Sequence, residues 1–312
     1  MANHSNQTKH PKPILVTGGH RTGTTWVGRM LSAGGEAAYI SEPLNVLHRP
    51  GVMSTPVRYW YTYICPENEA EYLPALRQTL DFRYHLGLEI ASLRSRKDLL
   101  RMGRDWSTFF TGRIKRLRPL IKDPFAVFSA PWFANRLGCQ VVITVRHPAA
   151  FASSLKRLNW TFQLHDLLNQ PLLMRDWLEP YQAEMCGLPD QDVVGRAALL
   201  WKMIYQVVDE FRRQQPGFLI VRHEDLSLNP LHGFRRIYAD LDLDLTPKAQ
   251  ASILSSSSEG NPSEISSVHA TRVDSRQNLD NWKRRLSTDE IDRIRRITTG
   301  VVERYYPEQV WE

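Results

Sequence analysis

Short apolar runs separated by longer segments of mixed polarity organise this chain of 312 residues. The clearest run, 139–145, is a continuous and mostly β-branched stretch, which is typical of a strand covered on both faces of a sheet. Such runs, alternating with helical segments, predict an α/β fold built around a parallel sheet. The predicted strands are 14–17, 37–40, 119–122, 139–145 and 218–221.

Apolar residues at helical spacing predict the helices between these strands. The longest helix, 192–213, repeats apolar side chains on one face and ends at Pro216-Gly217. The last helix begins at Ser287, which has Glu290 at the spacing of a capping box. Residues 46–118 are longer than a crossover between the second and third strands needs, so we expect a helical insertion on the substrate side. Further helices are predicted near 24–34, 67–82, 128–137, 149–158, 230–241 and 247–258.

Composition is that of an ordinary globular protein, with 42% hydrophobic and 23% charged residues. We expect a single domain over 1–312, with a flexible N-terminus at 1–12. The net charge of +7 favours an anionic partner, but a phosphorylated nucleotide, an acidic glycan, nucleic acid and a lipid surface all fit it. Basic runs at 94–97, 113–118 and 283–285 are more typical of solvated helix faces than of binding patches.

The cysteines and the first residues bear on location. Cys65, Cys139 and Cys186 are widely separated and odd in number, which indicates neither a disulfide framework nor a metal site. The polar segment 1–12 lacks the apolar core of a signal peptide. No run approaches the roughly 18 apolar residues of a membrane span. These features predict a cytoplasmic protein without a transmembrane segment.

The first predicted strand runs into a loop that carries Gly18, Gly19 and Gly23, and then into a helix. Glycines let the backbone approach a ligand closely, and the helix N-terminus adds partial positive charge. The expected occupant is a phosphate or an anion of similar shape, although a tight turn in any α/β protein has the same pattern. The loop is not a nucleotide triphosphate loop of the G-x-x-x-x-G-K-[ST] type, because Thr24 follows Gly23 and the cation stands earlier, at Arg21.

A second anion site is indicated at the end of the strand 139–145. Arg146 lies at the strand tip, Pro148 starts the next helix, and Ser154 follows about two turns into that helix. An arginine and a serine in this arrangement can face one anion together, since the guanidinium offers a fork of donors. Taken alone, the same turn is equally well explained as a structural cap.

Both anion sites resemble those of sulfotransferases. The stretch His-Arg-Thr-Gly-Thr-Thr-Trp at 20–26 is similar to the family's phosphosulfate loop, Pro-[Lys/Arg]-Ser-Gly-Thr-Thr. Arg146, Pro148 and Ser154 match its site for the 3′-phosphate, although His147 departs from the usual Asp or Asn. His223 stands before Glu-Asp-Leu, where the family has a tyrosine that touches the adenine.

The resemblance implies a three-layer, P-loop-like fold that binds 3′-phosphoadenosine 5′-phosphosulfate (PAPS) and releases adenosine 3′,5′-bisphosphate. A basic segment ending in Trp282-Lys283 is similar to the loop that closes the nucleotide site in this family, so residues 255–285 are expected to close it here. No metal is implied. The residues assigned to the nucleotide by the resemblance are Gly19, His20, Arg21, Thr22, Gly23, Thr24, Thr25, Trp26, Arg146, Ser154, His223 and Arg276.

Catalysis by such an enzyme needs a base for the acceptor and positive charge for the leaving group. Glu42, at the end of the second strand, stands where glycan and tyrosyl-protein sulfotransferases carry a catalytic glutamate. The resemblance assigns Arg21 to the leaving oxygen and Lys122 to the sulfuryl oxygens. Other candidate bases are Asp123, His20 and His147.

The acceptor is left open by the sequence. A hydroxyl, rather than an amine, on a carbohydrate or another small metabolite is expected, with no nucleic acid partner and with the oligomeric state undetermined. Two alternatives remain: a phosphotransferase that uses ATP on the same loop architecture, and a module that binds anions without catalysis.

Overall fold

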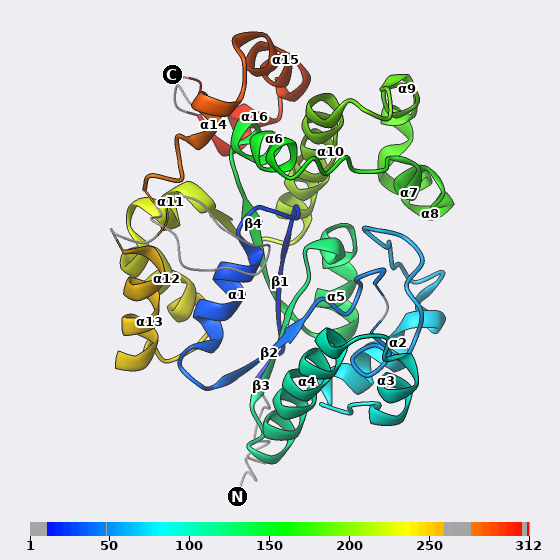
Figure 1. Ribbon diagram of the computed structural model, residues 1–312, viewed down its shortest axis with the longest axis vertical. Helices are drawn as coiled ribbons and strands as arrows, with labels where there is room; N and C mark the ends of the chain where they lie inside the picture. Colours follow the sequence, from blue (N-terminus) through cyan, green and yellow to red (C-terminus); the bar gives the residue numbers. More distant parts are fainter. Residues whose placement is uncertain (1–10, 48, 259–261, 263–275, 308–310, 312) are drawn as a thin grey trace, which may run out of the picture.

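The computed structural model describes residues 11–47, 49–258, 262, 276–307 and 311 (Figure 1). Its centre is a sheet of five strands in the order β2-β3-β1-β4-β5, and every neighbouring pair is parallel. The predicted parallel sheet and its strands are therefore confirmed, each within about one residue. The strands are β1 Ile14–Gly18, β2 Ala37–Ser41, β3 Arg118–Lys122, β4 Gln140–Val145 and β5 Leu219–Arg222.

Alternate residues of the central strand feed two separate cores. Ile14 and Val16 of β1 pack on one face with α1 Thr24–Ser32, α12 Pro230–Asp240 and α13 Pro247–Ser257. Leu15 belongs to the core of the opposite face. That face is covered by α5 Ala130–Leu137, α6 Pro148–Arg157 and α10 Val193–Gln214. The protein thus has the three layers that were predicted (Figure 1).

The order of the strands places a switch point at β1. The chain continues from β1 to β2 and β3 on one side and to β4 and β5 on the other, so the connections diverge above the carboxyl end of β1. In open parallel sheets, ligands bind at this position. The loops after β1, β2, β3 and β4 all begin at this edge of the sheet. They carry Arg21, Glu42, Asp123 and Arg146, respectively.

Residues 46–117 form the predicted helical insertion between β2 and β3. It contains α2 Glu69–Leu80, α3 Leu86–Ser92 and α4 Arg96–Ile114. Ser95 caps α4, since its hydroxyl accepts a hydrogen bond from the Asp98 N–H. α4 packs along β2, which is an edge strand, and therefore covers that edge of the sheet (Figure 1).

The remaining elements lie after β3 and around the C-terminal part. The predicted helix 128–137 is a 3₁₀ segment, η1 Pro124–Ser129, followed by α5. The capping box of Ser287 and Glu290 is present at the start of α15 Thr288–Thr298. The other elements are α7 His165–Leu168, α8 Pro171–Leu173, η2 Met174–Leu178, η3 Glu179–Tyr181, α9 Gln182–Gly187, α11 His223–Leu228, α14 Asn281–Arg285 and α16 Val302–Tyr305.

Two predicted segments fall largely outside the described residues. Of the closing loop expected over 255–285, residues up to Ser257 belong to α13 and residues from Asn281 belong to α14, while 259–261 and 263–275 are not described. The predicted flexible N-terminus also lies outside the described residues, except for 11 and 12.

Candidate functional site

The loop after β1 has the backbone geometry of an anion cradle. Gly23 precedes α1 with a φ of 95°, in the left-handed region that favours glycine. The first helical hydrogen bond runs from Val27 N to Gly23 O (3.0 Å), so the amides of Thr24, Thr25 and Trp26 have no carbonyl partner inside the helix. Three amides at the positive end of a helix offer a site for a phosphate or sulfate group.

Two tyrosines from distant parts of the chain hold this loop. The Tyr61 hydroxyl accepts a hydrogen bond from His20 N (3.0 Å), and the Tyr205 hydroxyl accepts one from Gly19 N (3.3 Å). Tyr205 in turn donates to the carbonyl of Thr144 on β4 (2.8 Å). The sequence reasoning missed both tyrosines. A hydroxyl on the otherwise apolar face of α10 was the available signal for Tyr205.

Two arginines and a serine, from three different segments, meet beside the loop. Arg21 Nε donates to Ser154 Oγ at 3.1 Å, and Arg146 Nη1 donates to the Arg21 carbonyl at 3.2 Å. Arg146 is buried at the end of β4, and Ser154 is buried on α6. The structure therefore brings together the two anion sites that the sequence predicted separately.

The charges in this arginine cluster oppose one another. Burial, followed by the charges of Arg146 and Arg157, lowers the pKa of Arg21 to about 10. Burial also lowers the pKa of Arg146. The charge of Glu224 raises this pKa, whereas the charges of Arg285 and Arg157 lower it further. Buried like charges are stabilised when an anion binds among them. A phosphate therefore fits the Arg21–Arg146–Ser154 site.

Arg157 and Arg285 are the members of this arginine cluster that the sequence did not predict. Arg285 lies at the end of α14, in a basic run that is typical of a solvated helix face. Burial lowers the pKa of Arg285, and the charge of Arg157 lowers it further. The predicted Arg276 donates through its Nη2 to the Leu228 carbonyl at the end of α11 (3.2 Å).

Glu42 and Lys122 form an ion pair at the ends of β2 and β3. Asn45 Nδ2 donates to the other oxygen of Glu42 at 2.7 Å. Burial alone would raise the pKa of Glu42, but the charge and hydrogen bond of Lys122, with Asn45 and Arg49, outweigh burial and leave that pKa below its ordinary value. Glu42 is thus a carboxylate at neutral pH, held with a φ of 49° in the left-handed region.

Asp123 and His20 are less accessible than Glu42. Both oxygens of Asp123 accept backbone hydrogen bonds, from Leu44 N (2.6 Å) and Phe125 N (3.0 Å), and its side chain is fully buried. Burial and the charge of Glu42 raise the pKa of Asp123 to about 7. These contacts describe a residue that anchors the loop after β2, whereas the Glu42 side chain stays 18% exposed.

The His20 ring lies inside an aromatic cluster. Its Nδ1 is 2.6 Å from the Tyr61 hydroxyl, and burial, followed by the charge of Arg21, lowers its pKa to about 3. His20 is therefore neutral. The rings around it are those of Tyr61, Phe125, Phe151, Trp160 and Phe162.

His223 lies where the sequence comparison expected an adenine contact. A Cβ on Gly23 would lie 2.7 Å from His223 Cδ2, so the imidazole packs directly against the anion loop. Its ring centroid is 5.7 Å from that of Trp26, and its Nδ1 is 2.9 Å from Ser227 Oγ. Burial lowers the pKa of His223 to about 3, with Arg146 adding to the shift. Two rings beside the loop suit a purine.

His147 belongs to a different environment. Its ring stacks on Trp282 at 5.2 Å, and neither ring nitrogen has a hydrogen-bond partner among the described residues. Burial, with the charges of Arg146 and Lys283, lowers its pKa to about 3. His147 thus connects the Arg146 turn to the C-terminal Trp-Lys pair by packing.

The site therefore has two halves at one end of the sheet. One half carries amides and guanidiniums, and the other carries the Glu42–Lys122 pair. The charges of Arg21 and Glu42 both act on the pKa of His20, so both halves lie near that ring. An anionic donor held in the first half would face a carboxylate and an ammonium in the second, an arrangement suited to group transfer.

Comparison with known proteins identifies one family. The model of the sulfotransferase family matches residues 13–247. Among solved structures, the sulfotransferase domain from the curacin biosynthetic pathway aligns with 92% of this chain and 96% of its own, at 16% identity and a TM-score of 0.44. A sulfotransferase of Mycobacterium avium aligns with 96% of this chain and 77% of its own, at 15% identity and a TM-score of 0.46. A sequence search of curated proteins finds no match.

Proposed function

The chain belongs to the sulfotransferase family, and from this premise we propose that it transfers a sulfuryl group from PAPS to an acceptor hydroxyl. The observation that carries the proposal is the arginine cluster at the carboxyl end of the sheet. Arg21 and Arg146 lie together with Ser154 beside the three helix amides, which suits a donor with two separate anionic groups.

Each part of the donor has a proposed contact. Arg146 and Ser154 hold the 3′-phosphate, and the loop from Thr22 to Thr25, with the helix amides of Thr24, Thr25 and Trp26, holds the 5′-phosphosulfate. The rings of Trp26 and His223 take the adenine. The remaining residues that we assign to the donor are Gly19, His20, Gly23 and Arg276.

Arg21 and Lys122 divide the charge stabilisation. The Nε of Arg21 is directed to Ser154, so its terminal nitrogens are the atoms that we assign to the leaving oxygen. Lys122 lies beside Glu42 and, in this proposal, contacts the sulfuryl oxygens. Both cations stabilise negative charge that grows as the donor bond breaks.

Glu42 is the proposed general base. It accepts the proton of the acceptor hydroxyl while the acceptor oxygen forms its bond to sulfur, and the bond from sulfur to the 5′-phosphate oxygen breaks. Adenosine 3′,5′-bisphosphate leaves with the electron pair of that bond. Of the candidate bases, Glu42 combines a carboxylate state with side-chain exposure.

For the acceptor, we propose only a broad chemical class. We propose a carbohydrate or another small metabolite, received by the insertion between β2 and β3. We also propose a cytoplasmic location, which the free thiols of Cys65, Cys139 and Cys186 support. An acceptor screen with labelled donor, read by mass spectrometry, identifies the molecule.

Calorimetry tests the donor assignment before any acceptor is known. Adenosine 3′,5′-bisphosphate should bind tightly without added metal, and ATP with Mg²⁺ should compete weakly. The opposite preference would favour the alternative phosphotransferase and overturn the proposal. Binding without turnover of any acceptor in the screen would favour an anion-binding module.

Glu42→Gln tests the base, because it keeps the shape and removes proton acceptance. The variant should lose about 10²–10⁴-fold in kcat while binding the bisphosphate as the wild type does. Unchanged turnover would remove Glu42 from the mechanism and leave the donor assignment standing.

A further inference from the structure

The outer face of α4 is apolar. Leu99, Trp106, Phe110 and Ile114 recur at spacings of seven, four and four residues, so they form one stripe along the helix. All four are exposed, from 44% for Trp106 to 64% for Ile114. The rings of Trp106 and Phe110 stack on each other at 5.2 Å. The helix therefore presents a continuous apolar surface to solvent.

The inner face of α4 is a different set of residues. Phe109 is buried, and Gly112 lies so close to Phe82 that a Cβ there would approach its ring within 2.6 Å. The packing of α4 against the rest of the protein therefore does not use the stripe of Leu99, Trp106, Phe110 and Ile114. A further apolar residue, Leu100, is 78% exposed beside it.

Exposed apolar side chains are concentrated in this part of the molecule. Among the described residues, eight of the twelve large hydrophobic side chains that are exposed lie between 86 and 114. Scattered exposed leucines need no explanation, but a cluster of this size marks an interaction surface.

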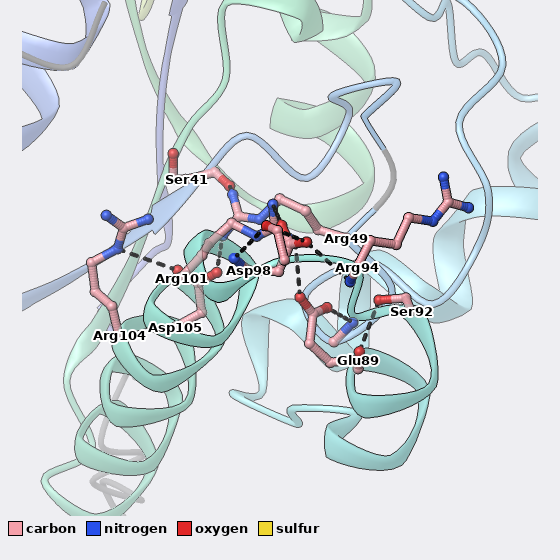
Figure 2. Close-up of polar contacts among 11 residues, drawn as sticks. Ser41, Arg49, Glu89, Ser92, Arg94, Asp98, Arg101, Arg104 and Asp105 are labelled. Carbon is pink, nitrogen blue, oxygen red and sulfur yellow. Dashed lines mark hydrogen bonds and ion pairs between the residues drawn. The ribbon is translucent and has the colours of Figure 1, made fainter.

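The charges around the stripe are positive. Lys97, Arg104 and Arg113 on α4, and Lys115 directly after it, are all exposed. The acidic residues of α4 are paired with arginines inside the polar network of Figure 2: Asp105 pairs with Arg49 and, at 3.7 Å, with Arg104, and Asp98 pairs with Arg101 (2.9 Å). The acids are thereby withdrawn from the surface, which keeps an apolar stripe flanked by cations.

We propose that α4 is a docking surface for an anionic lipid bilayer. A helix that lies in a membrane interface combines an apolar face that includes aromatic rings with flanking lysines and arginines. The excess of exposed cations selects a negatively charged surface, since a second copy of this chain would bring the same cations together. No helix in the described part of the chain is long and apolar enough to span a bilayer, so docking is peripheral.

The position of α4 gives this surface a consequence for the proposed site. Arg49 donates to the Ser41 carbonyl (2.6 Å), directly before Glu42, and its other nitrogen pairs with Asp105 on α4 (Figure 2). The helix is thus joined to the acceptor half of the site. A bilayer on the outer face of α4 would be connected to the Glu42 region only through this helix and Arg49.

Vesicle sedimentation of the full chain tests the proposal without donor or acceptor. The protein should sediment with vesicles of phosphatidylcholine and phosphatidylglycerol, release at high salt, and remain in solution with phosphatidylcholine alone. Failure to bind the anionic vesicles would overturn the proposal, whatever the outcome of the donor-binding test.

Two variants of α4 separate the contributions of apolar and charged groups. Trp106→Ser with Phe110→Ser should reduce vesicle binding by about tenfold or more, because the rings no longer enter the interface. Replacement of Lys97, Arg113 and Lys115 by Glu should reduce it by about a hundredfold. All five positions are exposed, so the fold should be retained, and circular dichroism verifies this.

A matched charge control uses the opposite flank of the sheet. Arg235, Arg236 and Lys248 are exposed on α12 and α13, and their replacement by Glu changes the net charge equally (Figure 1). Binding should be reduced far less than by the α4 variant. An equal loss would mean that total charge, not α4, determines binding, and would overturn the proposal. Sedimentation equilibrium that shows dimers through the stripe, without vesicle binding, would assign the surface to a second copy instead.

Discussion

Arginines gather at two places in this protein, and their neighbours differ. In the insertion, Arg49 and Arg101 pair with Asp105 and Glu89, so charges cancel within the fold (Figure 2). In the donor half of the site, the pKa values of arginines are lowered by burial and by other arginines. In the first arrangement the charges are neutralised within the fold, while in our proposal the anionic donor adds negative charge to the second. The comparison thus separates arginines with a structural role from arginines that we assign to binding.

The largest effect expected from this comparison is on stability in the insertion. Arg49→Ala leaves the buried Asp105 with only a longer contact to Arg104 (3.7 Å) and should lower the free energy of unfolding by about 3–5 kcal/mol, measured by urea denaturation. Arg113→Ala, on an exposed side chain of the same helix, should change the free energy of unfolding by less than about 0.5 kcal/mol. Equal stability of both variants would contradict the structural role of the insertion pairs.

Arg146→Ala should affect ligand binding much more than the stability of the ligand-free protein. Affinity for adenosine 3′,5′-bisphosphate should fall by about a hundredfold or more, since charge-assisted hydrogen bonds to a phosphate are lost. The ligand-free protein should keep most of its thermal stability, because the variant loses the attraction to Glu224 but also the repulsion from Arg285 and Arg157. Calorimetry and thermal denaturation measure the two quantities. A large loss of ligand-free stability would erase the distinction between the two groups of arginines.

A smaller effect is expected where the two halves of the site meet. Asn45 donates to Glu42, so Asn45→Ala should raise the pKa of that carboxyl. Since the proposed mechanism needs the carboxylate, the acid limb of kcat/KM should move to higher pH, by about one unit. If the acid limb of kcat/KM stays at the same pH in Asn45→Ala, Glu42 is not the group that titrates in this profile. The Glu42→Gln variant should lack the acid limb altogether.

The smallest effect concerns His147. Its pKa is about 3 in the folded chain, against 6.5 for an ordinary histidine, so between these pH values the unfolded chain binds a proton that the folded chain does not. Stability should therefore decline as pH falls below 6.5, and His147→Phe should reduce that decline by about 1 kcal/mol per pH unit. The same pH dependence of the melting temperature in both proteins would contradict this origin.

Local signals were sufficient for the fold and for the location of the site. The strands could be predicted because continuous apolar runs need no partner to be recognised, and the glycine loop is contained in ten residues. Arg146 and Ser154 were found for the same reason, as they lie on one strand-helix turn.

Direct contacts between distant residues could not be predicted from local patterns. The family resemblance assigned Arg21 and Ser154 to one nucleotide, but it did not show that these side chains, 133 positions apart, form a hydrogen bond with each other. Tyr61 and Tyr205 reach the same loop from the insertion and from α10. Arg285 was assigned to a solvated face because a short basic run has the same composition in both settings.

Backbone conformation at two proposed catalytic residues has an evolutionary consequence. Arg21 and Glu42 have φ values of 68° and 49°, where a side chain costs about 1–2 kcal/mol relative to glycine. Drift of Arg21 toward glycine would remove this cost together with one charge of the arginine cluster, whereas glycine at position 42 would leave the buried Lys122 without its ion-pair partner. A lineage selected for heat resistance alone would thus lose its chemistry at Arg21 first, and the retention of Arg21 would require continued demand for the sulfated product.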